Sequence, residues 1–470
     1  MSPENRKLLI ASYYYPPAGG IGLPGCMRVV KFVKYLEGWD VDVLTVQPEK
    51  YPSFFKMDNN IELPIGSENV YRTSITDLFQ GIIGMRDFAK NILAGKSSGG
   101  SKSEDIKSNG MPNSTLPGVE NRGIPGKIKD FIHDACYFPD FASPWIPDAL
   151  RSGLKIIRRN RPDIIFATGM PWSALIVANM LHRFTGVPYV CDFRDPWVGN
   201  PFHKSKGRFF DGMSKYFEST VVRKSALVTA NTVPLKDQIA GRYPDLPIDR
   251  IMVLPNGYDP DDFEHLRVNG EDGHSKGELR LVHAGFLYGE RNPIPILDAI
   301  KRNHETYRYG ENAVQFVQIG SMEKNIEAIM SGYVESGYAK CLGQLPYRSC
   351  IETISRADVL IIIQQSTDTQ IPSKIYEYIS LDKPIITVTK AGGALWNLIE
   401  RYEFGYLFEP EDVAAIGEKI HQLYDRKNAE GELKERYPRR ADFDIRKICG
   451  KLSDSMVEIC RAASRSGKGR

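Results

Sequence analysis

Residues 371–379 combine the residue types that could bind a diphosphate. Pro372 can open a helix, Ser373 can meet free backbone N–H groups, and Lys374 places a cation in the first turn. A helix N-terminus with a cation beside it attracts phosphate, and Glu377 shares the helix face of Lys374 because the two are three residues apart. The segment therefore suits a nucleotide sugar, which has an anionic part and a hydroxyl-rich part. The alternative is an ordinary strand–helix unit with a surface Lys–Glu pair.

Other candidate ligand-binding residues in the second half follow predicted strands. Gly285 ends the strand at 279–284, and Arg291 comes soon after it. Arg291 could reach a diphosphate from the side opposite to Lys374, and two cations would neutralise a leaving group without a metal. The turn at Gln344 could present backbone groups to a nucleobase. A solvated loop arginine and a plain strand-end turn are the alternatives.

The first half offers two more loops at strand ends. Gly19 and Gly20 follow the first strand and would let backbone N–H groups approach a phosphate or sugar. Asp192, Arg194 and Asp195 end another strand, where two carboxylates and a guanidinium could bind sugar hydroxyls or assist proton transfer. Ligands of open α/β sheets bind at such strand ends. The alternatives are a flexible glycine loop and an internal ion pair of Arg194 with an aspartate.

Several other polar residues are not assigned to a site. Asp259, Asp261 and Asp262 superficially suggest metal chelation, but they have no convergent partner in the sequence and are predicted to be surface charges. His283 lies within a strand and is predicted to be a core or cleft-wall residue. The sequence has no Walker A, H-E-x-x-H or G-x-S-x-G motif.

The composition describes a globular protein of more than one domain. The chain has 470 residues, of which 42% are hydrophobic and 25% charged, and its net charge of +3 is too balanced for a typical nucleic-acid binder. Its 7 cysteines form no C-x-x-C pair, which disfavours a disulfide framework or a structural zinc site and fits a reducing cytoplasm. We find no signal-peptide pattern and no apolar run of membrane-spanning length.

Short apolar runs alternate with helical segments, which predicts an α/β protein with parallel sheets. Predicted strands lie at residues 7–15, 40–47, 163–168, 188–193, 226–230, 251–254, 279–284, 313–319, 338–342, 358–364, 384–389 and 405–408. Predicted helices lie at 27–37, 172–184, 209–223, 293–302, 351–356, 372–381, 394–400 and 413–426. The two series indicate two Rossmann-like domains, at 1–265 and 278–430.

Three further segments complete the predicted organisation. A polar, glycine-containing linker separates the domains at 266–278, and a Gly- and Ser-rich stretch at 95–126 is predicted to be a disordered loop. A last helix at 444–464 follows the second domain. Stretches 77–93 and 127–141 are amphipathic, which is typical either of a segment on a membrane surface or of one packed on its own domain.

Six motifs in one order resemble the family 4 glycosyltransferases of the GT-B fold. They are Tyr-Pro-Pro-x-Gly-Gly at residue 15, Asp-Phe-Arg-Asp-Pro-Trp at 192, Pro-Asn-Gly-Tyr-Asp at 255, Gly-Phe-Leu-Tyr at 285, Ser-Lys-Ile-Tyr-Glu-Tyr at 373 and Lys-Pro-Ile-Ile at 383. The resemblance spans nearly the whole chain except residues 95–126. It implies two Rossmann-like domains facing a central cleft, with the last helix crossing back to the first domain.

The resemblance also implies an activity, which is retaining, metal-independent transfer from a nucleoside-diphosphate sugar to a glycan or lipid-linked acceptor, as in cell-surface polysaccharide biosynthesis. Lys374 and Arg291 match the diphosphate-binding cations, Glu377 matches a ribose-binding glutamate, and Gly19 and Gly20 match the glycine loop near the donor. The donor would contact mainly the second domain, including Gly285, Ser373 and Gln344. The acceptor would lie mainly on the first domain. From the residues at the strand end described above, rather than from the resemblance, we predict Arg194 and Asp195 on the acceptor side and Asp192 in the catalytic set with Lys374 and Arg291.

The sequence departs from the family pattern at Thr369, where a glutamate normally contacts the transferred sugar. This departure leaves the donor sugar open. Two alternatives therefore stand beside the transferase, namely a GT-B-like sugar-nucleotide epimerase and a non-catalytic nucleotide-sugar-binding protein. Peripheral contact with the inner face of the cytoplasmic membrane is a further expectation. No cofactor or nucleic-acid partner is expected.

Overall fold

The structure is a computed structural model, and it describes residues 6–18, 24–52, 57–59, 61–77, 79, 124–201, 205–264, 266, 277–289, 291–365 and 367–467. Gly19 and Gly20 lie outside the described residues. So do residues 267–276 of the predicted linker at 266–278 and residues 95–123 of the predicted loop at 95–126. Of the amphipathic stretch at 77–93, the structure describes residues 77 and 79.

The first domain is built on a seven-stranded parallel sheet of order β3-β2-β1-β4-β5-β6-β7. Its strands are β1 (Arg6–Ala11), β2 (Trp39–Val46), β3 (Val70–Thr73), β4 (Ile164–Gly169), β5 (Tyr189–Phe193), β6 (Leu227–Ala230) and β7 (Ile251–Val253). The central strands β4 and β5 are buried at every residue, because helices cover both faces of a parallel sheet.

The second domain is built on a six-stranded parallel sheet of order β10-β9-β8-β11-β12-β13. Its strands are β8 (Leu279–Ala284), β9 (Val314–Ile319), β10 (Ala339–Gly343), β11 (Val359–Gln364), β12 (Ile385–Thr389) and β13 (Tyr406–Phe408). In both sheets the first strand lies inside the sheet, so the strand order reverses there. That reversal is where ligands of open α/β sheets bind.

Helices connect the strands. Those of the first domain are α1 (Pro24–Tyr35), α3 (Ile124–Cys136), α4 (Ile146–Asn160), α5 (Ser173–Thr185), α6 (Arg208–Lys224) and α7 (Val233–Arg242). The short helix α8 (Asp261–Glu264) comes next in the chain, and its Phe263 belongs to a core of the second domain. Those that follow are α9 (Ile294–Tyr307), α10 (Lys324–Glu335), α11 (Tyr347–Ser355), α12 (Lys374–Ile379), α13 (Ala394–Tyr402), α14 (Val413–Glu430) and α15 (Ile445–Gly467). None of the helices within the described ranges is long and apolar enough to cross a bilayer.

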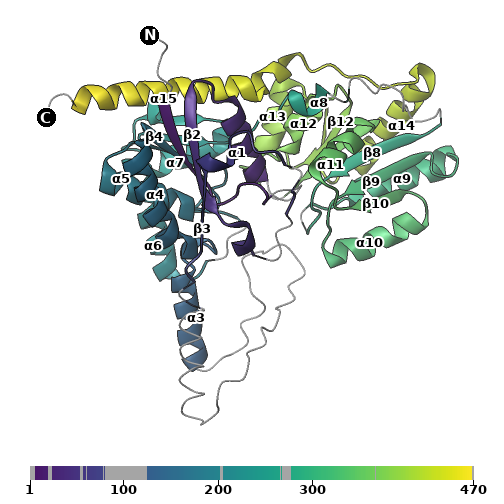
Figure 1. Cartoon of the computed structure of the whole chain (residues 1–470). Coiled ribbons are helices and arrows are strands. Elements are labelled where there is room, and N and C mark those ends of the chain that lie inside the picture. Colours follow the sequence, from purple (N-terminus) through teal and green to yellow (C-terminus); the bar gives the residue numbers. More distant parts are fainter. Residues whose placement is uncertain are drawn as a thin grey trace.

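The last helix, α15, leaves the second domain and runs along the first (yellow, Figure 1). Ile448, Leu452 and Met456 are each at most 2% exposed and belong to the first domain's hydrophobic core. The turn before α15 instead contributes Phe443 to a core of the second domain. A single stretch of chain therefore ties the two domains together.

The predicted α/β architecture with two parallel sheets is confirmed, and every predicted strand and helix is present within a few residues of its expected bounds. The elements that were not predicted are β3, α4, α7, α8 and α10, and α3 was predicted only as part of an amphipathic stretch. β3 has only four residues, too few for a periodic pattern to distinguish a strand from a loop. α7 and α10 contain Gly241 and Gly332, which weaken a helical signal.

Candidate active site between the two domains

Two cations gather at the carboxyl edge of the second sheet. Lys374 is the first residue of α12, and its Nζ lies directly over Gly285, the residue after β8. A Cβ at Gly285 would come within 2.3 Å of that nitrogen, and the φ of +145° also favours glycine. Arg291 is held at the same edge, because its Nε donates to Gln364 Oε1 at 2.8 Å. Gly285 thus makes room for the lysine.

The electrostatics of this pair are unusual for protein cations. Burial, and then the charge of Arg291, lower the pKa of Lys374 from 10.5 to about 7. Burial also lowers the pKa of Arg291. Neither side chain forms an ion pair with a carboxylate among the residues that the structure describes. Partly buried, unpaired cations are unfavourable until an anion joins them, so the arrangement is suited to binding one.

His283 and Gln318 support Lys374 from inside the sheet. His283 Nε2 lies 3.1 Å from Lys374 Nζ, and His283 Nδ1 lies 2.8 Å from Gln318 Oε1. Both residues are fully buried, on β8 and β9. The sequence analysis treated His283 as a core or cleft-wall residue and did not consider Gln318. The signal that could have found them is a polar residue at a buried position of an otherwise apolar strand.

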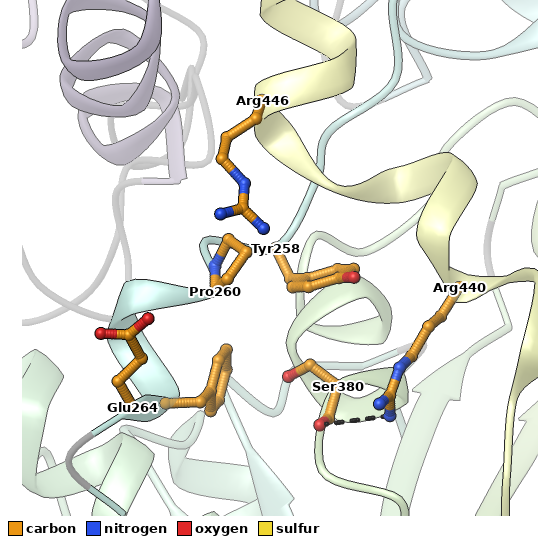
Figure 2. A pocket seen from close by; sticks show the side chains of 7 residues that line it. Tyr258, Pro260, Glu264, Ser380, Arg440 and Arg446 are labelled. Carbon is orange, nitrogen blue, oxygen red and sulfur yellow. Dashed lines mark hydrogen bonds between the residues drawn. The ribbon is translucent and has the colours of Figure 1, made fainter.

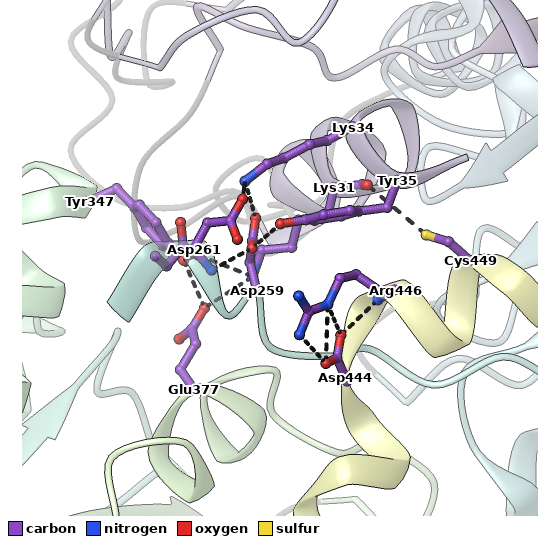
Figure 3. A network of polar contacts seen from close by, with 11 residues as sticks. Lys31, Lys34, Tyr35, Asp259, Asp261, Tyr347, Glu377, Asp444, Arg446 and Cys449 are labelled. Atoms are coloured by element: carbon purple, nitrogen blue, oxygen red, sulfur yellow. Dashed lines mark hydrogen bonds and ion pairs between the residues drawn. The ribbon is translucent and has the colours of Figure 1, made fainter. Parts of the chain in front are cut away.

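Glu377 faces the first domain in a network of charged groups (Figure 3). Its Oε1 accepts a hydrogen bond from Tyr347 at 3.3 Å and lies 4.0 Å from Lys31 Nζ of α1. Tyr347 and Lys31 also contact Asp262, so the two carboxylates share both partners. Burial raises the pKa of Glu377, whereas the charge of Lys31 lowers it.

The same network corrects the prediction that the aspartates at 259–262 are isolated surface charges. Asp259 is 3% exposed and accepts hydrogen bonds from Lys34 and from Tyr35, at 3.0 and 2.5 Å. Asp261 forms an ion pair with Lys34 at 2.6 Å. The partners come from α1, more than 200 residues earlier, and for that reason the local sequence shows no convergent group.

The structure also corrects the prediction that Asp192 is catalytic. Its carboxylate is fully buried and accepts two hydrogen bonds from Arg28, at 2.9 and 3.0 Å. Thr168 and Thr229 donate two more, at 2.8 and 2.7 Å. With both oxygens occupied inside the first domain, Asp192 is not available to a substrate. Arg28 goes on to bind the carbonyl of Leu254, so the pair braces the chain where it leaves β7.

Asp195 and Arg194 lie at the end of β5, but only Asp195 reaches the second domain. Asp195 accepts a hydrogen bond of 2.5 Å from Gln370, and burial raises its pKa while the charge of Arg194 lowers it. Arg194 instead donates to the backbone carbonyls of Gly169 and Met170. The alternative of an Arg194–aspartate ion pair is replaced by these backbone contacts.

The segment between β11 and α12 closes over the first domain. Thr232 of the first domain donates to the carbonyl of Thr369 at 2.8 Å, beside the contact of Gln370 with Asp195. Thr369 is 9% exposed, so the position that departs from the family pattern lies at the domain boundary. Ser373 caps no backbone N–H group of α12, contrary to expectation, which leaves its hydroxyl uncommitted to the helix. Gln344 follows β10 at the same sheet edge, on the outermost strand.

A pocket of about 220 Å³ lies elsewhere at the domain junction (Figure 2). It is lined by Tyr258, Pro260, Phe263, Glu264, Ser380, Arg440 and Arg446. Its arginines are already paired, Arg440 with Asp382 and Arg446 with Asp444. No predicted site residue lines this pocket, so it is separate from the paired cations.

Comparison with known proteins identifies the family of the chain. The sequence model described as Glycosyltransferase Family 4 matches residues 122–262, and the one described as Glycosyl transferases group 1 matches residues 269–441. The chain belongs to the family 4 glycosyltransferases. The first match covers part of the first domain, including Asp195, and the second match covers the second domain, including Lys374, Arg291 and Glu377. No curated protein matches the chain by sequence.

Solved structures with the same architecture are themselves distant in sequence. Anabaena HepE, crystallised with UDP, is 13% identical with a TM-score of 0.54, over 96% of this glycosyltransferase and 100% of that chain. Sucrose-phosphate synthase from Thermosynechococcus elongatus is 13% identical with a TM-score of 0.55, over 99% and 100% of the two chains. These likenesses show the fold alone, and that fold is the GT-B arrangement of two Rossmann-like domains.

Proposed function

We propose that this glycosyltransferase moves a sugar from a nucleoside-diphosphate sugar to a glycan or lipid-linked acceptor with retention of anomeric configuration and without a metal, in cell-surface polysaccharide biosynthesis. The observation that carries the proposal is the pair of cations Lys374 and Arg291, at the sheet edge that faces the first domain, neither of which forms an ion pair within the described part of the chain. The diphosphate of the donor is the anion that this pair lacks.

The chemistry assigned to the two cations follows from the bond that breaks. When the bond between the anomeric carbon and the diphosphate breaks, negative charge accumulates on the departing phosphate oxygen. A guanidinium and an ammonium placed beside that oxygen stabilise the charge as it develops, which lowers the barrier. Retention places the acceptor on the side from which the diphosphate leaves, so the departing oxygen is positioned to take the acceptor's proton.

The remaining donor contacts are assigned by their place around the cations. Glu377, on the same helix face as Lys374, accepts hydrogen bonds from the ribose hydroxyls. Ser373 contributes a hydroxyl to the donor site, since that hydroxyl caps no backbone N–H group of α12. The glycines 19 and 20 and Gln344 remain proposed donor contacts. On the first domain, Asp195 and the neighbouring Arg194 are proposed to border the acceptor.

The test is transfer by the Lys374→Ala variant. Loss of one charge-stabilising donor lowers turnover by roughly 100- to 1,000-fold in well-packed active sites, so we expect a loss of that size with an unchanged melting temperature. UDP-glucose is the first donor to try, because HepE binds it. Lys340→Ala is the matched control, since Lys340 is an exposed lysine on β10. Near-normal turnover of Lys374→Ala would refute the role assigned to this cation.

Two further measurements test the finer parts of the proposal. Transfer should persist in EDTA, and loss of activity that Mg²⁺ restores would contradict metal independence. NMR of the product should show the anomeric configuration of the donor, and inversion would contradict retention.

A lipid-linked acceptor is anchored in a membrane, so we propose that the protein also contacts the membrane surface. Phe131 of α3 and Phe209 of α6 are 51% and 61% exposed, and their ring centroids are 5.7 Å apart. Exposed Lys129 and Arg208 flank them, as in segments that contact anionic lipid. Sedimentation with anionic vesicles should capture the protein and release it when both phenylalanines are changed to serine. Equal capture of that double variant would count against this surface.

A further inference from the structure

Lys374 Nζ contacts a chain of buried hydrogen bonds formed by His283 and Gln318, and the donor and acceptor of each bond can be assigned. Gln318 Nε2 lies 2.7 Å from the carbonyl of Gly285 and 3.0 Å from that of Ile319. Carbonyl oxygens only accept hydrogen bonds, so this nitrogen donates to both. The other end of the amide, Oε1, is therefore the atom that faces His283.

The orientation of Gln318 fixes the tautomer of His283. Gln318 Oε1 can only accept, so His283 Nδ1, at 2.8 Å, carries the ring proton and donates it. Burial, and then the charge of Lys374, hold the pKa of His283 well below its usual 6.5, so the ring is neutral. Its Nε2 then carries a lone pair and accepts a hydrogen bond from Lys374 Nζ at 3.1 Å.

Gly285 contacts both ends of this chain of hydrogen bonds. The glycine whose carbonyl is held by Gln318 is the one over which Lys374 Nζ lies, with no room for a Cβ. One hydrogen of the ammonium is thus committed to His283 and one side of it is bounded by backbone. An ammonium has three hydrogens, so two remain for other acceptors.

We propose that His283 is a positioning residue that aims Lys374 at the donor diphosphate, and that Gln318 sets the imidazole tautomer this role requires. The inference deepens the proposed function and rests on it, because it assigns how the diphosphate-binding lysine is oriented. A buried imidazole needs a partner such as Gln318 in any case, so the contact that points to positioning is the one from the other ring nitrogen, Nε2, to Lys374 Nζ at 3.1 Å.

The pH profile of kcat/KM for the donor distinguishes positioning from packing. The groups that act electrostatically on Lys374 are Arg291, Cys350 and Glu377, in addition to the contact with His283. Activity should fall at alkaline pH as the lysine loses its proton. Removing the acceptor in His283→Leu makes the ammonium less favourable, so the alkaline limb should move about one pH unit toward acid.

Further variants test each hydrogen bond of the chain from Gln318 through His283 to Lys374. Gln318→Met frees the ring to take the other tautomer and should move the limb in the same direction. His283→Gln keeps a hydrogen-bond acceptor within reach of Lys374, so its alkaline limb should lie close to that of the unaltered protein. Gln315→Met is the matched control, because Gln315 lies on the same strand and bonds to Asn312 and Gly337, away from the lysine. Its profile should match that of the unaltered protein.

The outcomes separate this inference from the proposed function. An unmoved limb in both His283→Leu and Gln318→Met, with Lys374→Ala still inactive, would overturn the positioning role and leave the function standing. Full activity of Lys374→Ala would instead overturn the function assigned to the lysine. If His283→Leu fails to fold, Gln318→Met and His283→Gln decide, and an unmoved limb in Gln318→Met then overturns the inference.

Discussion

At the scale of single residues, Lys374 is the side chain whose charge state matters most. A lysine with a pKa of about 7 is largely neutral at pH 8, whereas an exposed lysine is fully charged there. In the proposed function a bound diphosphate supplies the missing negative charge, which should raise the pKa of Lys374 again. Binding of the diphosphate and binding of a proton are therefore linked.

This linkage predicts proton uptake when UDP binds. At pH 8 we expect about one proton per site to be taken up, and we expect the uptake to decrease as the pH falls toward 7, since more of the lysine is then already charged. Calorimetry in buffers of different ionisation enthalpy measures the uptake. The Lys374→Met variant should bind more weakly and show no buffer dependence. A binding enthalpy at pH 8 that is the same in every buffer would contradict the lowered pKa.

At the scale of elements, α15 belongs to the first domain by its packing although it follows the second domain in sequence. Its buried residues Ile445, Ile448, Cys449, Leu452 and Met456 recur at helical spacing and form one apolar stripe. The stripe lies against the first domain's core, including α1.

Truncating this stripe should destabilise the first domain. Leu452 is fully buried, so Leu452→Ala leaves a cavity and should cost about 2–5 kcal/mol of unfolding free energy. Denaturant unfolding followed by circular dichroism measures the loss. The adjacent Lys451→Ala is the control, because Lys451 is exposed and should change stability by less than about 0.5 kcal/mol. Equal stabilities of the two variants would mean that α15 packs only loosely.

At the scale of the whole molecule, hydrogen bonds from the segment after β11 hold the domains together beside the paired cations. Gln370 donates to Asp195 and the carbonyl of Thr369 accepts from Thr232. These contacts bring the segment that precedes Lys374 against the first domain, where the proposed donor and acceptor groups meet.

Breaking one of these contacts should open the molecule. For Gln370→Ala we expect a larger radius of gyration by small-angle X-ray scattering and a donor KM raised about three- to tenfold, as for loss of one hydrogen bond. Gln365→Ala is the control, because Gln365 bonds to the backbone of Asn292 within its own domain. An unchanged radius and KM in Gln370→Ala would show that other contacts keep the domains closed.

The sequence by itself determined the architecture and the position of the cations. Alternation of apolar runs with helical segments is a local pattern, and it gave two parallel sheets with nearly correct strand bounds. Lys374 and Glu377 belong to one short helix, so their shared face could be predicted from their spacing. The order of six motifs was enough to indicate the family before any contact was known.

Only the tertiary structure decided which polar residues are free to meet a substrate. Asp192 and Arg28 are 164 residues apart, and His283 and Lys374 are 91 apart, so no local spacing reports either contact. The first contact removes an expected catalytic residue from the site, and the second brings His283, predicted to be a core or cleft-wall residue, to Lys374. A carboxylate or imidazole has the same sequence signature whether its partner is a substrate or another strand. The difference arises when strand order and domain packing bring the partners within hydrogen-bonding distance.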